Sequence, residues 1–135
     1  MERYTPIKVH MTRKLIGVSP ENTVKEACEI MVEFDIGSLV VIENNKVVGF
    51  FTKSDIIRRV VIPGLPNSTQ VREIMSSELI SVDGNISLGE VLDLMAKKGI
   101  KHILIEDNGK IVGIFSLSDL LTASRRRLET AIAAE

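Results

Sequence analysis

The sequence predicts an α/β fold: two tandem β-α-β-β-α repeats, packed sheet to sheet as one module with a pseudo-two-fold axis. The first observation is an internal duplication, because a shift of 64 residues aligns the chain with itself without a gap from about Met11 to Asp55. The second is the fixed order of hydrophobic periods in each copy. The third is size. A copy of roughly 55 residues buries too little apolar surface alone, so two copies are expected to share a core.

Turn and capping signals place the first strand and the first helix of each copy. Residues 15–18 form a short apolar run that is followed by turn residues. Thr23 and Glu26 have the spacing of a capping box, and the apolar residues after them recur on one helical face. The corresponding pair in the second copy is Ser87 and Glu90.

A β-hairpin and a closing helix complete each copy. Residues 38–42 and 46–51 are rich in strand formers, and Asn108-Gly109 in the second copy is a strong signal for a two-residue hairpin turn. A helix is expected from Lys53 to about Val60, and another from Leu117 onward. The predicted boundaries are repeat one at 8–61, a linker at 62–70, repeat two at 71–122 and a helical tail at 123–135.

Composition narrows the class of protein. The chain has 135 residues, 44% of them hydrophobic, and a formal net charge of -1, so no bulk charge attracts nucleic acid or a membrane surface. A single cysteine excludes an internal disulfide framework and suits a reducing compartment. No apolar run reaches the roughly 18 residues that span a bilayer, and no signal-peptide core follows the N-terminus. We therefore expect a soluble cytoplasmic protein.

One motif occurs in both copies and carries the chemistry. Gly49 to Asp55 and Gly113 to Asp119 share the form glycine, two apolar residues, Thr or Ser, two further residues and Asp. Each should be a strand that runs into a helix N-terminus, where a hydroxyl and a carboxylate lie beside unpaired backbone N–H groups. Such a corner can hold the ribose and phosphate of a nucleotide, or it can simply cap the helix. The candidate residues are Thr52, Asp55, Ser116 and Asp119.

These pieces, in this order and twice, resemble the cystathionine-β-synthase (CBS) domain. They are Val18-Ser19-Pro20, Thr23 to Ala27, the hairpin, and Gly49 to Asp55. Repeat two departs from the pattern at Val82-Asp83-Gly84 and at Val91. The resemblance covers about residues 8 to 122. It implies a disc-like tandem pair, often dimerised through its helices, that binds adenosine nucleotides in the cleft between the repeats.

The resemblance also implies roles for single residues. The Asp of each corner would accept hydrogen bonds from the ribose hydroxyls, and the Thr or Ser would meet ribose or phosphate. Lys101 and His102 would face phosphates, while the matching Gly37 and Ser38 carry no charge, so positive charge is expected mainly from repeat two. The plainer alternative is a solvated lysine beside a half-buried histidine. The residues expected to line an adenine slot are Ile16, Val18, Ile80, Val82, Ile36 and Ile100.

Other chemistry finds little support. Cys28 falls on an apolar helix face and is expected to be a small core residue. The two histidines, His10 and His102, have no metal-ligand spacing. No catalytic triad, Walker loop or dinucleotide fingerprint is present, so we expect neither an enzyme nor a cofactor. The run Arg125-Arg126-Arg127 either complements a helix dipole or forms a basic patch for nucleic acid or an acidic partner.

The predicted function is the sensing of an adenosine nucleotide, AMP first, with ADP or ATP as further candidates, by a homodimer that reports to an unknown partner protein. Two alternatives remain open. One is a ligand-free oligomerisation or scaffold module, and the other is a binder of S-adenosylmethionine or another adenosyl ligand. The sequence leaves undecided which corner is occupied and whether the dimer is parallel or antiparallel.

Overall fold

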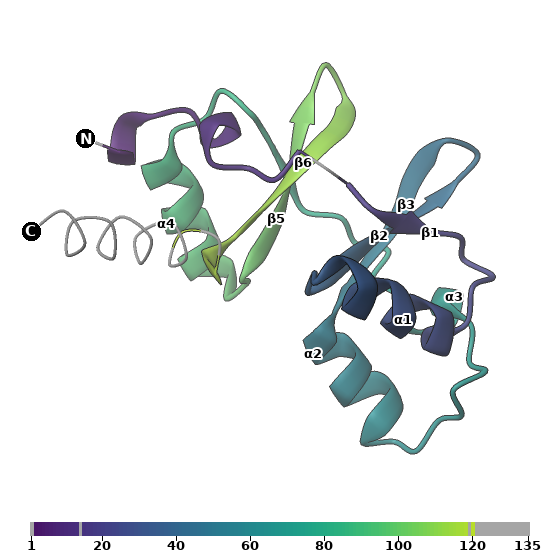
Figure 1. Ribbon diagram of the computed structural model, residues 1–135. Coiled ribbons are helices and arrows are strands. Elements are labelled where there is room, and N and C mark those ends of the chain that lie inside the picture. Colours follow the sequence, from purple (N-terminus) through teal and green to yellow (C-terminus); the bar gives the residue numbers. More distant parts are fainter. Residues whose placement is uncertain (1, 14, 119, 121–135) are drawn as a thin grey trace, which may run out of the picture. The chain divides into compact units, whose positions relative to one another are not determined.

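The structure is a computed structural model that describes residues 2–13, 15–118 and 120, and the chain divides into two compact units (Figure 1). The first-repeat unit consists of residues 15–79. The second-repeat unit consists of residues 1–14 together with residues 80–135. The units therefore differ from the predicted repeats. Residues 8–13 belong to the second-repeat unit, and residues 71–79 belong to the first-repeat unit.

The first-repeat unit has a three-stranded sheet in the order β1-β2-β3. Strand β1 runs parallel to β2, and β2 pairs antiparallel with β3. Its elements are β1 (Gly17–Val18), α1 (Val24–Phe34), β2 (Ser38–Glu43), β3 (Lys46–Thr52), α2 (Lys53–Ile56), a π-helical segment (Ile57–Val61) and α3 (Val71–Ile74). The closing helix was expected as one α-helix, but after Ile56 it widens into the π-helical segment.

The second-repeat unit repeats this order in the sheet β4-β5-β6. Its elements are 3-10 turns at Glu2–Tyr4 and Ile7–Val9, followed by β4 (Ser81–Asp83), α4 (Leu88–Lys98), β5 (His102–Asp107) and β6 (Lys110–Ser116). Residues 117, 118 and 120 are helical, and the remainder of the predicted closing helix lies outside the described residues. The α/β class and its duplicated order of elements are confirmed.

Local signals in the sequence explain most of these elements. Thr23 and Glu26 form the expected capping box at the start of α1, and the side chain of Ser87 caps α4 by accepting from the Glu90 N–H at 3.2 Å. The hairpin turns need left-handed backbone, which Asn44 and Asn45 adopt at φ 53 and 62 degrees. Asn108 and Gly109 do the same at φ 51 and 79 degrees.

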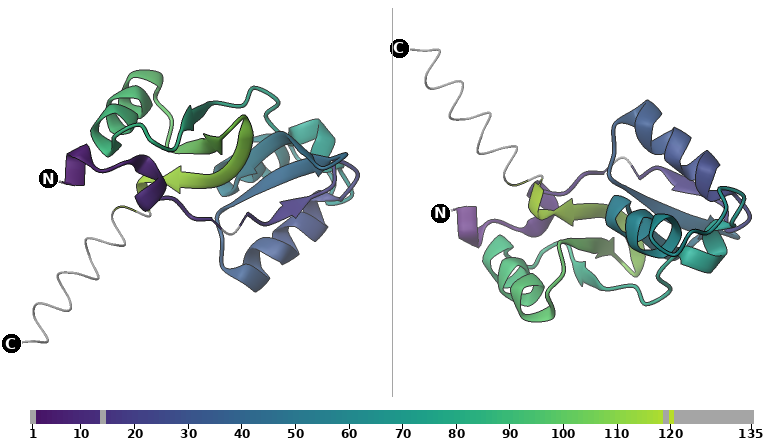
Figure 2. Two further views of the ribbon diagram at one scale, coloured as in Figure 1. Left: turned by 90° about the horizontal axis from the view of Figure 1, so that it is seen from above. Right: turned by 90° about the horizontal axis from the view of Figure 1, so that it is seen from below.

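In each unit one long helix packs on the sheet (Figure 2). Each unit also has its own hydrophobic cluster. In the first-repeat unit Val24, Ala27 and Met31 of α1 pack against buried residues of β2 and β3. Leu88, Val91 and Met95 of α4 take the same places in the second-repeat unit. There the first 3-10 turn lies beside α4, although the two are far apart in the sequence (Figure 1).

Two lead-in segments, residues 7–13 and 71–77, precede β1 and β4, and backbone hydrogen bonds attach them in equivalent ways. The Ile7 N–H donates to the Ile86 carbonyl at 2.7 Å, and the Val71 N–H donates to the Asn22 carbonyl at 2.8 Å. These pairs are related by the same 64-residue shift as the repeats. Ile7 is fully buried in the second-repeat cluster. The lead-ins are therefore part of the two cores.

The motif glycines lie where these lead-ins pair with the edge strands β3 and β6, next to the bridges Phe50–Ser76 and Thr12–Ile114. A Cβ on Gly49 would overlap the Sδ of Met75, and a Cβ on Gly113 would lie 2.5 Å from the Sδ of Met11 and 3.0 Å from the Thr12 carbonyl oxygen. Both strands also shift register beside the glycine, so the bulge expected of a strand glycine is present as well. Close packing and an irregular strand thus occur together at these positions.

Candidate functional site

The first-repeat corner is built where β3 passes into α2. Thr52 is the N-cap of α2, and its Oγ1 accepts from the Asp55 N–H at 3.3 Å. The Asp55 Oδ2 accepts in return from the Thr52 N–H at 2.8 Å and from the Thr52 hydroxyl at 3.1 Å. The two predicted residues are therefore brought together, and they form a reciprocal capping box.

The second carboxylate oxygen of Asp55 takes no part in this box. Its Oδ1 lies 3.9 Å from the Arg59 Nε, a distance that marks an ion pair but exceeds that of a hydrogen bond. Arg59 in turn donates from Nη1 to the Ile74 carbonyl at 2.9 Å. The Asp55 side chain keeps 22% of its surface exposed. The corner thus has one oxygen that caps the helix and one that lies outside the capping box, beside Arg59.

The second-repeat corner begins with Ser116 at the end of β6. Ser116 is 7% exposed, and its hydroxyl lies 3.0 Å from that of Ser118, with either able to donate. Asp119 lies outside the described residues, so its expected pairing with Ser116 stays a prediction.

The expected phosphate-facing residues lie next to these corners. In the first-repeat unit Ser38 pairs with Thr52 across β2 and β3, and the Gly37 carbonyl accepts from the Lys53 N–H at 3.0 Å. In the second-repeat unit His102 pairs with Ser116, and an exposed Lys101 lies just before it. Strand pairing therefore places each of these residues at the end of the sheet where its corner forms.

One basic residue at this edge was missed. Lys53 follows Thr52 directly, and its Cδ and Cε lie 3.8 and 3.6 Å from the place that a Cβ on Gly37 would take. A register of β2 on β3 is needed to see this, because Lys53 and Gly37 are far apart in the chain. The only signal in the sequence was the position of Lys53 immediately after the motif threonine.

The residues expected to line an adenine slot divide into two groups. Val18 and Val82 are core residues, at 5% and 8% exposure. The four isoleucines are half-buried and pack against the edges of the two clusters; they are Ile16 and Ile36 in the first-repeat unit, and Ile80 and Ile100 in the second. Each unit thus has partly buried isoleucines packed against its hydrophobic cluster, and their contact with a base remains a prediction.

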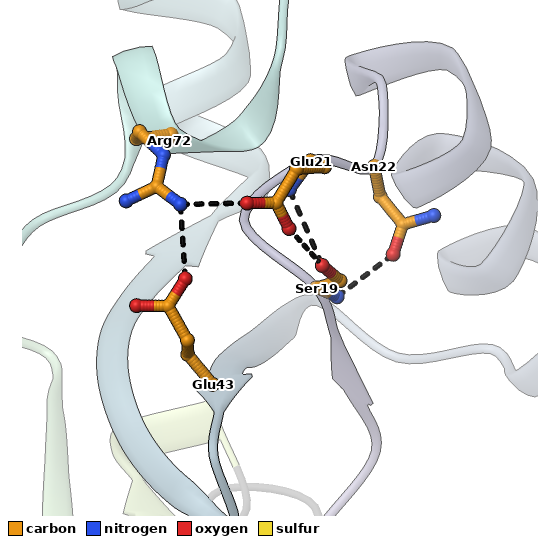
Figure 3. A network of polar contacts seen from close by, with 5 residues as sticks. All are labelled: Ser19, Glu21, Asn22, Glu43 and Arg72. Atoms are coloured by element: carbon orange, nitrogen blue, oxygen red, sulfur yellow. Dashed lines mark hydrogen bonds and ion pairs between the residues drawn. The ribbon is translucent and has the colours of Figure 1, made fainter.

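A polar network occupies the other end of the first-repeat sheet (Figure 3). Arg72 of α3 donates from Nη2 to Glu21 at 2.7 Å and to Glu43 at 2.9 Å. Hydrogen bonds from the Ser19 hydroxyl and then from Arg72 lower the pKa of Glu21, and both carboxylates raise the pKa of Arg72. Since Glu43 ends β2 and Thr52 pairs with the start of β2, this network fixes the lead-in far from the corner.

The remaining candidates carry no site chemistry. Burial raises the pKa of the half-buried Cys28 thiol, which suits a packing role. The His10 Nε2 shares a hydrogen bond of 2.7 Å with the Thr5 hydroxyl. Within the described ranges no three His, Cys, Asp or Glu residues are grouped as a metal site would need, and no helix is long and apolar enough to cross a bilayer. Arg125, Arg126 and Arg127 lie outside those ranges.

Comparison with known proteins shows one family throughout. A family model for the CBS domain matches residues 7–62 and 71–126. The CBS domain-containing protein YhcV of Bacillus subtilis is 37% identical over 114 residues, which span 84% of this chain and 81% of YhcV. A crystal structure of an uncharacterized conserved protein from Pyrococcus horikoshii is 62% identical, with a TM-score of 0.88 over 93% of this chain and 96% of that one.

A further solved structure shares the fold. It is the CBS domain pair of protein MJ0100, which was solved in complex with 5′-methylthioadenosine and S-adenosyl-L-methionine. It is 22% identical to this chain, with a TM-score of 0.78 over 92% of this chain and 98% of that one.

Proposed function

Because this chain belongs to the CBS-domain family, whose model matches both repeats, we propose that it is a regulatory module that binds an adenosine nucleotide. AMP is the first candidate, and ADP and ATP follow. The proposal includes no catalytic step. The observation that supports it most directly is the arrangement of the Asp55 carboxylate. Its Oδ2 caps the helix, while its Oδ1 lies outside the capping box, 3.9 Å from the Arg59 Nε.

A carboxylate in this state suits a ribose diol. It acts only as an acceptor, and each oxygen can take more than one donor. Oδ2 already holds the Thr52 N–H and hydroxyl, so the helix stays capped while Oδ1 accepts from a ribose hydroxyl. The ligand therefore does not need to dismantle the corner in order to bind.

Binding at Oδ1 would also compete with Arg59. That arginine holds the Ile74 carbonyl at the end of α3, in the segment that leads into repeat two. A ligand that draws Asp55 away from Arg59 changes the balance between these two contacts, and so biases the position of the lead-in. Repeat two has Ala123, which carries no charge, at the position that matches Arg59.

A second candidate function is the binding of an adenosyl compound without a phosphate chain. The fold-related MJ0100 pair holds two such compounds, and they would present the same diol to Asp55. A third is a scaffold that binds no nucleoside.

Isothermal titration with AMP, ADP, ATP, adenosine and S-adenosylmethionine separates the three. Tighter binding of AMP than of adenosine supports the nucleotide proposal. Equal or tighter binding of S-adenosylmethionine favours the second candidate. If none of the five compounds gives heat of binding or a thermal shift, the result supports the third candidate, a scaffold that binds no nucleoside.

We also propose that the module acts as a cytoplasmic homodimer. Exposed apolar side chains on the helical segments of the first-repeat unit support an association through those segments; Val32, Ile57 and Val61 are 82%, 53% and 66% exposed. Light scattering of wild type and of Val32→Glu tests it, and an unchanged monomeric mass in both would contradict the dimer.

A further inference from the structure

We propose that Lys53 is the phosphate-recognising cation of the first-repeat corner and sets its preference for nucleotides over adenosine. This inference rests on the proposed function and adds to it a residue and a selectivity. It replaces the expectation that positive charge comes mainly from repeat two.

Equivalent backbone pairs hold the lysine of each unit. The Lys53 N–H donates to the Gly37 carbonyl at 3.0 Å, and the Leu117 N–H donates to the Lys101 carbonyl at 3.1 Å. A shift of 64 residues turns one pair into the other. In the first-repeat unit the lysine is therefore the residue that begins the closing helix, and in the second it is the residue that precedes β5.

Side chains at such facing positions start only a few ångströms apart, about 4.5–5.5 Å between Cβ atoms. The long lysine stem covers that offset. In the first-repeat unit the stem of Lys53 does cross to the facing position, because its Cε lies 3.6 Å from where a Cβ on Gly37 would be. The missing side chain of Gly37 leaves this space open. Each unit thus has one lysine at the end of its own sheet where its corner forms: Lys53 follows β3 in the first-repeat unit, and Lys101 precedes β5 in the second.

Helix stability does not explain this lysine. Lys53 is the first residue of α2, where the positive end of the helix dipole disfavours a cation. Its ammonium group forms no ion pair with any residue that the structure describes, and its side chain is exposed. An exposed, unpaired cation beside Thr52 is well suited to meet the phosphate of a nucleotide whose ribose is held by Asp55.

The test compares AMP with adenosine by isothermal titration in wild type, Lys53→Met, Lys101→Met and the double variant. Lys46→Met is the matched control, because Lys46 is an exposed lysine at the start of β3, at the opposite end of that strand from Thr52. We expect Lys53→Met to weaken AMP about tenfold at the first corner, and to leave adenosine unchanged. The double variant should lose the preference for AMP, and Lys46→Met should keep it.

The outcomes distinguish this inference from the function on which it rests. If wild type prefers AMP, and Lys53→Met keeps that preference in the Lys101→Met background, then Lys53 has no such role and the nucleotide proposal stands. If wild type binds neither AMP nor adenosine, both fail together. An equal loss in Lys46→Met would show a general charge effect and overturn the assignment.

Discussion

The two capping boxes of the first-repeat unit allow a stabilising role to be separated from a binding role. Thr23 with Glu26 opens α1, and Thr52 with Asp55 opens α2. The reciprocal bonds are closely alike, since Glu26 accepts from the Thr23 N–H at 2.9 Å and Asp55 from the Thr52 N–H at 2.8 Å. We propose a ligand for Asp55 only. Glu26→Gln is therefore a matched control for Asp55→Asn.

The expected losses of stability and of AMP affinity follow from the carboxylate oxygen that each substitution changes. Both amides keep an oxygen that can accept from the N-cap N–H, so both variants should lose only a small and similar part of the stability. Asp55→Asn also replaces Oδ1, the oxygen proposed to hold the ribose, with an amide NH2 that cannot accept a hydrogen bond. A hydrogen bond to a charged group contributes about 1.5–3 kcal/mol, so AMP should bind about 10- to 100-fold more weakly.

The assay is isothermal titration with AMP beside urea unfolding of the same samples. An Asp119→Asn background leaves the first corner as the single site to be measured. In that background Asp55→Asn should abolish or strongly weaken binding, and Glu26→Gln should not. An AMP affinity within twofold of the parent in Asp55→Asn, or an equal loss in Glu26→Gln, would show that the carboxylate only caps its helix.

Three further predictions concern the framework of the two units. Ile7→Ala should lower the free energy of unfolding by about 2–5 kcal/mol, because the residue is fully buried in a core formed by the distant second repeat; a loss typical of a surface site in urea unfolding would contradict this. The lowered pKa of Glu21 means that its contribution to stability is present above the ordinary value of 4.5 and is lost as the pH falls through the folded pKa. In NMR titrations Ser19→Ala and Arg72→Met should each raise that pKa, and an unchanged pKa in either variant would refute the corresponding cause. The raised pKa of Cys28 predicts slower reaction with a disulfide reagent at neutral pH in the folded protein than in concentrated urea, and equal rates would show an accessible thiolate.

Features that depend on neighbours in the chain could be predicted from the sequence. The capping box of Thr23 and Glu26 and the left-handed turn at Asn108 each involve a few consecutive residues, whose conformational preferences are intrinsic. Asp55 was paired with Thr52 for the same reason. These local rules were sufficient for the order of the elements and for one corner of the candidate site.

Features that depend on pairing over distance could not be predicted in this way. Ile7 joins the second-repeat cluster, which no periodicity near residue 7 indicates. The place of Lys53 over Gly37 follows from the register of β2 on β3, which shifts by one residue between Val41 and Ile42. The alignment of the two repeats compared Gly37 with Lys101 and so showed a missing charge. The backbone pairing of Lys53 with Gly37 shows that a positive charge does lie beside this position, on the residue that follows β3.

The packing of the lead-ins also divides the repeated motif into a part that serves the fold and a part that serves the site. A side chain on Gly49 would displace Met75, and one on Gly113 would meet Met11 and the main chain of Thr12. The glycine is therefore required by the lead-in that pairs with the strand, with or without a ligand. Only the hydroxyl and carboxylate that follow it remain for binding, and they lie at the strand end that this packing supports. Nucleotide affinity should thus depend on the lead-ins indirectly, through the position of the corner, and on Thr52 and Asp55 by direct contact.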